Sequence, residues 1–174
     1  MTHSIIIGQT LSGKTTLAKR LAAWYLANGI GVVVLDPMND PGWNPDGAEN
    51  FILFTNAEEF LDFVKDPDRC LQAAIFVDES GMILDKYAEK FNWLTCQGRH
   101  HGHVVHLLAQ RAEMISKTLR SQCSTVFAFN INPDDAKAYA RDFNAPAIMD
   151  APNLPQGQYI KVSRFSPVKR GRLW

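Results

Sequence analysis

Short, nearly continuous apolar runs alternate along the chain with segments in which apolar residues recur at helical spacing. The apolar runs predict strands at residues 4–7, 30–35, 51–54, 73–77, 104–109 and 125–129. The helical spacing predicts helices at residues 15–28, 56–65, 82–97, 114–121 and 133–143. Apolar strands that alternate with helices are typical of a parallel sheet covered on both faces. We therefore expect an α/β fold with a mostly parallel central sheet and helices on both faces.

Two segments interrupt this alternation. Residues 37–50 contain three prolines and two glycines and show little periodicity, so we expect a loop there. Residues 144–158 are also Pro-rich and irregular, and they lead to a short strand at 158–162 and then to a basic tail. The tail residues are Arg164, Phe165, Lys169, Arg170, Arg172 and Trp174. Such a tail fits either a contact with a nucleic-acid backbone or a solvated end.

The composition is that of an ordinary globular protein. The 174 residues fit a single domain spanning 1–174 with its core at about 4–143, and 46% of them are hydrophobic. Lys plus Arg and Asp plus Glu each number 18, so the formal net charge is zero. This balance excludes a globally basic protein that coats nucleic acid and restricts any DNA contact to a local patch.

The cysteines and the lack of long apolar runs indicate a cytoplasmic protein. Cys70, Cys96 and Cys123 are odd in number and widely spaced, which argues against a disulfide scaffold and for a reducing compartment. No apolar run approaches the roughly 18 residues of a membrane helix. Residues 1–7 do not have the pattern of a signal peptide.

Polar residues follow the expected strands where these end. They are Gly8, Asp36, Asp78, Glu79, Gln110 and Arg111. Because ligands bind at the carboxyl ends of parallel strands, these residues are expected to converge on one edge of the sheet.

The segment Gly8–Thr15 matches the pattern G-x-x-x-x-G-K-[ST] and lies between an expected strand and an expected helix. Its glycines allow the backbone N–H groups to surround a phosphate. Lys14 should reach the β- and γ-phosphates, and the hydroxyl of Thr15 should hold Mg²⁺. The expected nucleotide-binding residues are Gly8, Gln9, Thr10, Leu11, Ser12, Gly13, Lys14, Thr15 and Thr16.

Three residues at the ends of later strands are candidates for catalysis. Asp78 follows an apolar strand and is placed to bind Mg²⁺, while Glu79 is placed to orient or deprotonate an attacking water. Without the phosphate loop, the pair would be interpreted as two solvated acids. Gln110 ends another strand, where an amide can contact the γ-phosphate or the water. A glutamate beside the aspartate favours hydrolysis of ATP over transfer to a small substrate.

Arginine and histidine clusters add two further hypotheses. Hydrolysis of this kind often needs an arginine supplied by a neighbouring subunit, for which Arg99 is the first candidate and Arg111 the second. Histidines gather between residues 100 and 106, near Cys96. A zinc site is disfavoured because His103 and His106 fall on opposite faces of a strand and no C-x-x-C pair exists.

Together, these motifs resemble the FtsK/HerA superfamily of P-loop ATPases. The resemblance covers residues 4–129 and rests on the phosphate loop, the Leu-Asp-Pro and Val-Asp-Glu-Ser-Gly boxes, and Gly-Arg-His-His-Gly leading to Leu-Ala-Gln-Arg. It implies a three-layer P-loop NTPase of the additional-strand, catalytic-glutamate type. On this resemblance Lys14, Thr15, Asp78 and Glu79 act in one subunit, and Gln110 senses the γ-phosphate.

The small size is similar to the viral branch of that superfamily, the genome-packaging ATPases of membrane-containing icosahedral viruses and phages. That branch implies a hexameric or similar homo-oligomeric ring that uses ATP and Mg²⁺ to move double-stranded DNA into a preformed capsid. It also implies capsid or portal-vertex proteins as partners, and a location in the host cytoplasm or the virion.

Other classes of protein share parts of the pattern. A thymidine-kinase-like nucleoside kinase has a similar phosphate loop and acidic pair, but its paired zinc-binding cysteines and its lid are not visible here. A phage assembly ATPase of the zonula-occludens-toxin type shares the core but is typically membrane-anchored. A nucleotide-binding module without hydrolysis is disfavoured by Glu79.

Overall fold

The computed structural model describes residues 2–44, 46–78 and 89–174, so Glu79 and the first part of the helix predicted at 82–97 lie outside the described residues. The strands are β1 Ser4–Ile7, β2 Val32–Leu35, β3 Phe51–Phe54, β4 Ala74–Val77, β5 Val104–Ala109, β6 Thr125–Ala128, β7 Gln158–Ser163 and β8 Ser166–Arg172. The helices are α1 Lys14–Ala27, α2 Ala57–Lys65, α4 Lys117–Gln122 and α5 Pro133–Asp142, and residues 89–96 are also helical.

The eight described strands form one sheet in the order β3-β2-β4-β5-β1-β6-β7-β8. The strands from β3 to β6 pair in parallel, whereas β7 and β8 are antiparallel to their neighbours. In this order β5 lies between β1 and β4, which is the additional strand that the resemblance implied. The predicted α/β fold with a mostly parallel sheet is therefore confirmed.

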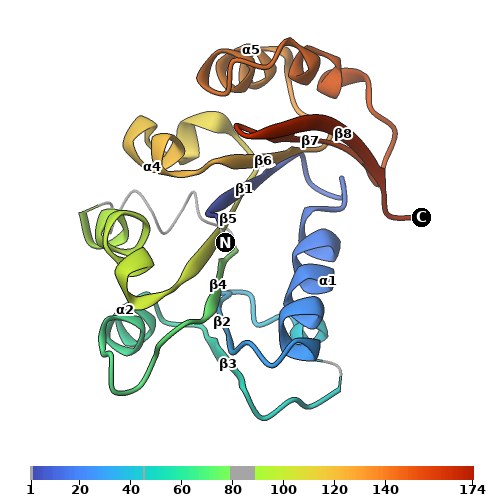
Figure 1. Ribbon diagram of the computed structural model, residues 1–174. Coiled ribbons are helices and arrows are strands. Elements are labelled where there is room, and N and C mark those ends of the chain that lie inside the picture. The colour runs from blue at the N-terminus through green and yellow to red at the C-terminus, as the bar shows by residue number, and fades with distance from the viewer. Residues whose placement is uncertain (1, 45, 79–88) are drawn as a thin grey trace.

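Helices cover both faces of the sheet and make three layers (Figure 1). Helix α1 packs on one face, where Leu17 and Tyr25 join Ile6 in one buried cluster. The helices α2, α4 and α5 contribute to the cluster on the other face, to which β1 gives Ile5 and Ile7. The central strands are buried on both sides, which explains why they are nearly all apolar in sequence.

Local capping residues determine where several helices begin. Asn56 accepts hydrogen bonds from the backbone N–H groups of Glu58 and Glu59 at the start of α2, and the two acidic residues suit the positive end of the helix. The helix predicted at 114–121 begins later, at Lys117, because Ser116 caps it and residues 112–114 form a 3₁₀ turn.

The prediction of a basic tail after residue 163 is wrong. Residues Ser166–Arg172 form β8, which pairs with β7 at the outer edge of the sheet. Lys169 and Arg170 lie on this strand, and its side chains are largely exposed to water. An exposed edge strand needs no apolar residues, so the hydrophobic pattern does not reveal it. Before β7, the irregular segment folds in part as a 3₁₀ helix over Pro146–Asn153.

Candidate functional site

The loop between β1 and α1 has the backbone shape of a phosphate-binding nest. Leu11 and Gly13 have positive φ angles of 63° and 112°. A β-carbon at Gly8 would lie 2.7 Å from the Cβ atom of Phe129, so only glycine fits there. The first N–H groups of α1 have no acceptor within the helix, and together with the loop amides they make an anion-binding concavity.

Lys14, Thr15 and Asp78 converge at the end of this loop. Lys14 is buried, and its Nζ atom donates a hydrogen bond to the carbonyl oxygen of Gln9 at 3.0 Å. The hydroxyl of Thr15 donates to Oδ2 of Asp78 at 3.2 Å. A hydroxyl beside a carboxylate is a pair of hard oxygen ligands of the kind that Mg²⁺ prefers. The donor set therefore fits a magnesium ion bound with a polyphosphate.

Gln110 lies beside the same loop, although it is far from it in sequence. It directly follows β5, and its Oε1 atom accepts a hydrogen bond from the Thr10 hydroxyl at 3.4 Å. An amide at this position faces the end of the loop at which a terminal phosphate would lie. Glu79, which follows Asp78 in sequence, is outside the described residues.

A cavity of about 390 Å³ brings these groups together. Its lining residues are Thr10, Leu11, Gly13, Lys14, Thr15, Thr16, Gln110, Gln156 and Trp174. Gly8, Gln9 and Ser12 form the frame of the loop and do not line this cavity. Most of the expected nucleotide-binding residues thus share one wall.

Gln156 and Trp174 are lining residues that the sequence reasoning did not find. Gln156 donates a side-chain hydrogen bond to the Leu11 carbonyl at 2.9 Å, and the Gly157 N–H donates to the Ser12 carbonyl at 3.0 Å. These bonds attach the segment before β7 to the phosphate loop. The sequence places Trp174 only in a basic tail, because no sequence pattern links a residue after a polar strand to a loop more than a hundred positions earlier.

The two candidate arginines do not reach the cavity of their own chain. Arg111 forms ion pairs with Asp135 at 3.2 Å and with Glu113 at 3.6 Å. Arg99 is exposed in a 3₁₀ turn before β5, at the amino ends of the parallel strands, whereas the phosphate loop lies at their carboxyl ends. Burial chiefly lowers the pKa of His3, and the positive charge of nearby Arg99 adds to that shift.

His103 and His106, which follow Arg99 in sequence, are buried. His106 contacts the Tyr25 hydroxyl on the α1 side of the sheet, whereas the His103 ring contacts the Val64 carbonyl on the α2 side. The predicted opposite orientation of the two rings is therefore confirmed. Within the described ranges, no group of three or more His, Cys, Asp or Glu residues is arranged to hold a metal ion.

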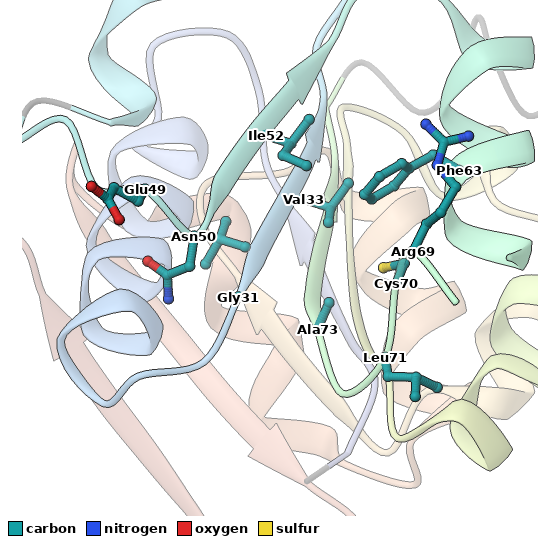
Figure 2. A pocket seen from close by; sticks show the side chains of 11 residues that line it. Gly31, Val33, Glu49, Asn50, Ile52, Phe63, Arg69, Cys70, Leu71 and Ala73 are labelled. Atoms are coloured by element: carbon teal, nitrogen blue, oxygen red, sulfur yellow. The ribbon is translucent and has the colours of Figure 1, made fainter. Parts of the chain in front are cut away.

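A second cavity, of about 180 Å³, lies at the amino ends of β2 and β4 (Figure 2). Its lining is mainly apolar, and the Arg69 guanidinium lies over the Phe63 ring at 4.9 Å. Burial raises the pKa of the Cys70 thiol in this cavity to about 11, so the thiol stays protonated and is a poor nucleophile. This cavity is on the sheet edge opposite the phosphate loop and adds nothing to the site described above.

A parallel sheet, a phosphate loop between β1 and α1, and an aspartate at the end of β4 bonded to the loop threonine define the fold of the P-loop nucleoside triphosphatases. Solved structures with the same fold include the genome packaging NTPase B204 from Sulfolobus turreted icosahedral virus 2 in complex with AMPPCP. The TM-score is 0.79 at 14% identity, and the match covers 98% of this chain and 97% of that one.

Two further similar structures come from other systems. VirB4 of Thermoanaerobacter pseudethanolicus matches with a TM-score of 0.75 at 11% identity over 99% of this chain and 89% of that one. The pCW3 conjugation coupling protein TcpA matches with a TM-score of 0.74 at 13% identity over 98% and 60%. No protein-family model and no curated protein sequence matches the chain. Among the helices in the described part of the chain, none is long and apolar enough to cross a membrane.

Proposed function

We propose that the protein is an ATP-hydrolysing DNA translocase that packages a viral double-stranded DNA genome into a preformed capsid. One observation carries this proposal: a phosphate-loop site with a bonded Thr15–Asp78 pair lies on a fold that is shared, nearly end to end, with a genome packaging NTPase. Neighbouring structures of that NTPase hold AMPPCP and ATP-γS, which supports a nucleoside triphosphate as the ligand.

The residues of the phosphate loop and those that follow β4 and β5 in sequence divide the work of hydrolysis among themselves. The loop amides and Lys14 bind and neutralise the β- and γ-phosphates, and Thr15 and Asp78 are the residues that would hold Mg²⁺. When bound, Mg²⁺ supplies positive charge to the phosphate oxygens. Gln110 orients the γ-phosphate or the attacking water. Glu79, which follows Asp78 in sequence, accepts a proton from the attacking water. The oxygen of the water bonds to the γ-phosphorus, and the bond between the γ-phosphorus and the β–γ bridging oxygen breaks.

The charge balance of the cavity supports a subunit-to-subunit arrangement. Of the described residues that line it, Lys14 is the one cation, while the transition state of phosphoryl transfer usually gains from an added arginine. We therefore include in the proposal a homo-oligomeric ring, hexameric or similar, in which a neighbour supplies Arg99 or, as second candidate, Arg111. The proposed partners are double-stranded DNA, which would pass through the channel of the ring, and capsid or portal-vertex proteins. The proposed location is the host cytoplasm or the virion.

The test is ATPase activity measured with and without duplex DNA, alongside an assay for phosphate transfer to nucleosides. The proposal expects stimulation by DNA and no phosphorylated nucleoside. Lys14→Ala should abolish nucleotide binding in calorimetry, and Glu79→Gln should bind ATP but not hydrolyse it. Lys137→Ala is a matched control, because this lysine is exposed on α5. Nucleoside phosphorylation without DNA stimulation would instead identify a nucleoside kinase.

A further inference from the structure

Trp174 presents a large aromatic surface to the nucleotide cavity. Its side chain is 53% exposed, although it lines the cavity together with the phosphate loop. A β-carbon placed at Gly157 would lie 2.6–3.0 Å from three atoms of the indole. The ring therefore rests directly on the Gly157 backbone, and its remaining surface is open.

Backbone hydrogen bonds hold this ring in position relative to the loop. The Leu173 N–H donates to the Gly157 carbonyl at 2.9 Å, and the Gly157 N–H donates to the Ser12 carbonyl at 3.0 Å. Leu173 itself is buried, and a β-carbon at Gly13 would lie 2.8 Å from its Cδ1 atom. Figure 1 shows β8 running toward the start of α1, where this contact is made. An aromatic ring fixed in this way needs little further ordering when a ligand binds.

The cavity is lined by two chemical kinds of side chain. Lys14, Thr15 and Gln110 supply the charged and polar groups that suit the phosphates. Leu11, Gln156 and Trp174 are uncharged, and the side chains of Leu11 and Trp174 are apolar or aromatic. A nucleoside triphosphate has two matching kinds of surface, a charged tail and a flat, aromatic base.

We propose that the indole of Trp174 is the stacking platform for the base of the bound nucleotide. This inference rests on the proposed function, which requires a nucleoside triphosphate in the cavity. Stacking on an aromatic ring tolerates every base, and the Gln156 Nε2 atom already donates to the Leu11 carbonyl. Stacking on this platform therefore distinguishes little between ATP and GTP.

Calorimetry with ATP and with inorganic tripolyphosphate separates base contacts from phosphate contacts. Trp174→Ala should weaken ATP binding by about 5- to 150-fold, which is the usual value of one base stack. It should leave tripolyphosphate binding unchanged, and Trp174→Phe should recover most of the ATP affinity. Trp24→Ala is the matched control, because Trp24 is 54% exposed on α1 and does not line the cavity.

Three other outcomes would contradict the platform, and a fourth would contradict only the packaging function. Equal weakening of ATP and tripolyphosphate by Trp174→Ala would mean that the ring only supports the loop, and unchanged ATP affinity would mean that the base lies elsewhere. A wild-type protein that binds neither ligand would overturn the proposed function and the platform together. A protein that shows the expected stacking pattern but no stimulation by DNA would overturn the packaging function alone.

Discussion

The hydroxyl of Thr15 donates a hydrogen bond to the carboxylate of Asp78 at 3.2 Å across 63 positions of sequence. Thr15 lies in the first turn of α1, and Asp78 follows β4, which is separated from β1 by β5. The hydrogen bond therefore fixes the distance between the phosphate loop and the end of a strand that is not adjacent to β1. On the proposed function, this bond would hold two oxygen ligands close together for one metal ion.

Thr15→Ala should weaken Mg²⁺-dependent ATP binding and slow hydrolysis. We expect each effect to be about 10- to 100-fold or more, because the loss of a supporting partner at a metal site typically costs that much. The reason is that the substitution removes one proposed ligand and leaves Asp78 without the hydroxyl. Thr15→Ser keeps the hydroxyl and should retain most of the activity. The ATP affinity of each variant, measured at increasing magnesium concentrations, tests this prediction. Equal behaviour of the alanine and serine variants would contradict the assignment.

Gln110→Ala should lower kcat by about 100-fold with little change in ATP affinity, because the amide is proposed to act on the reacting phosphate or water more than on the bound tail. Single-turnover hydrolysis and calorimetry separate the two effects. Gln97→Ala is a control, since Gln97 is exposed before the turn at Gly98–His101 on the opposite edge of the sheet. A loss of affinity equal to the loss of kcat would instead assign Gln110 to nucleotide binding.

Mixing Arg99→Ala subunits with Glu79→Gln subunits should restore part of the activity that each variant lacks, because a competent site can form between two different subunits. ATPase activity measured against the mixing ratio tests this. No rescue would favour Arg111 as the arginine supplied by the neighbour, or a mechanism within one subunit. Replacing that arginine has a structural cost of about 1 kcal/mol, because it removes a partner of the buried Asp135 carboxylate. Thermal unfolding of Arg111→Ala measures this cost separately.

The protein should lose stability as the pH falls from about 6.5 toward 3. Burial lowers the pKa of His106 to about 3 from 6.5, so the unfolded chain binds a proton in this window that the folded chain does not. The free energy of unfolding then decreases by about 1.4 kcal/mol per pH unit for this group, and its full contribution is present above pH 6.5. Burial also lowers the pKa values of His3 and His103, which adds to the trend.

Chemical unfolding of the wild type and of His106→Gln at several pH values tests the role of His106. Glutamine does not titrate, so the variant should show a shallower pH dependence between pH 6.5 and 4. It is also expected to be less stable at pH 7, because the ring accepts or donates hydrogen bonds with Ser4 and Tyr25 at 2.6 and 3.1 Å. Parallel curves for the two proteins would contradict a dominant role for this histidine.

The sequence predicts the sheet well where burial leaves a clear pattern. The runs ending at Ile7, Val77 and Ala109 are apolar because both faces of these strands are covered, and each predicted strand is present. The predicted parallel strands also place Thr15, Asp78 and Gln110 at one edge of the sheet. Asp78 and Gln110 follow the carboxyl ends of strands, and Thr15 begins the helix after another strand. In the structure Thr15 is hydrogen-bonded to Asp78, and Gln110 lines the same cavity as Thr15.

The hydrophobic pattern does not predict β8 or the position of Trp174. β8 is an exposed edge strand, so its polar residues carry no periodic signal. Trp174 reaches the loop only because the β7–β8 hairpin directs it there, and Gly157 leaves space for its ring. Such contacts depend on the position of a whole hairpin and are not encoded in any short segment.

The lining of the nucleotide cavity comes from distant parts of the sequence, because Thr10 and Trp174 both contribute to it. During synthesis on a ribosome, the phosphate loop emerges long before its opposite wall exists. On the proposed function, a nascent chain that presents the loop alone would hold nucleotide more weakly than the folded protein, and docking of the hairpin would complete the site. Nucleotide bound in the proposed way would therefore stabilise chains in which the hairpin has docked over chains in which it has not.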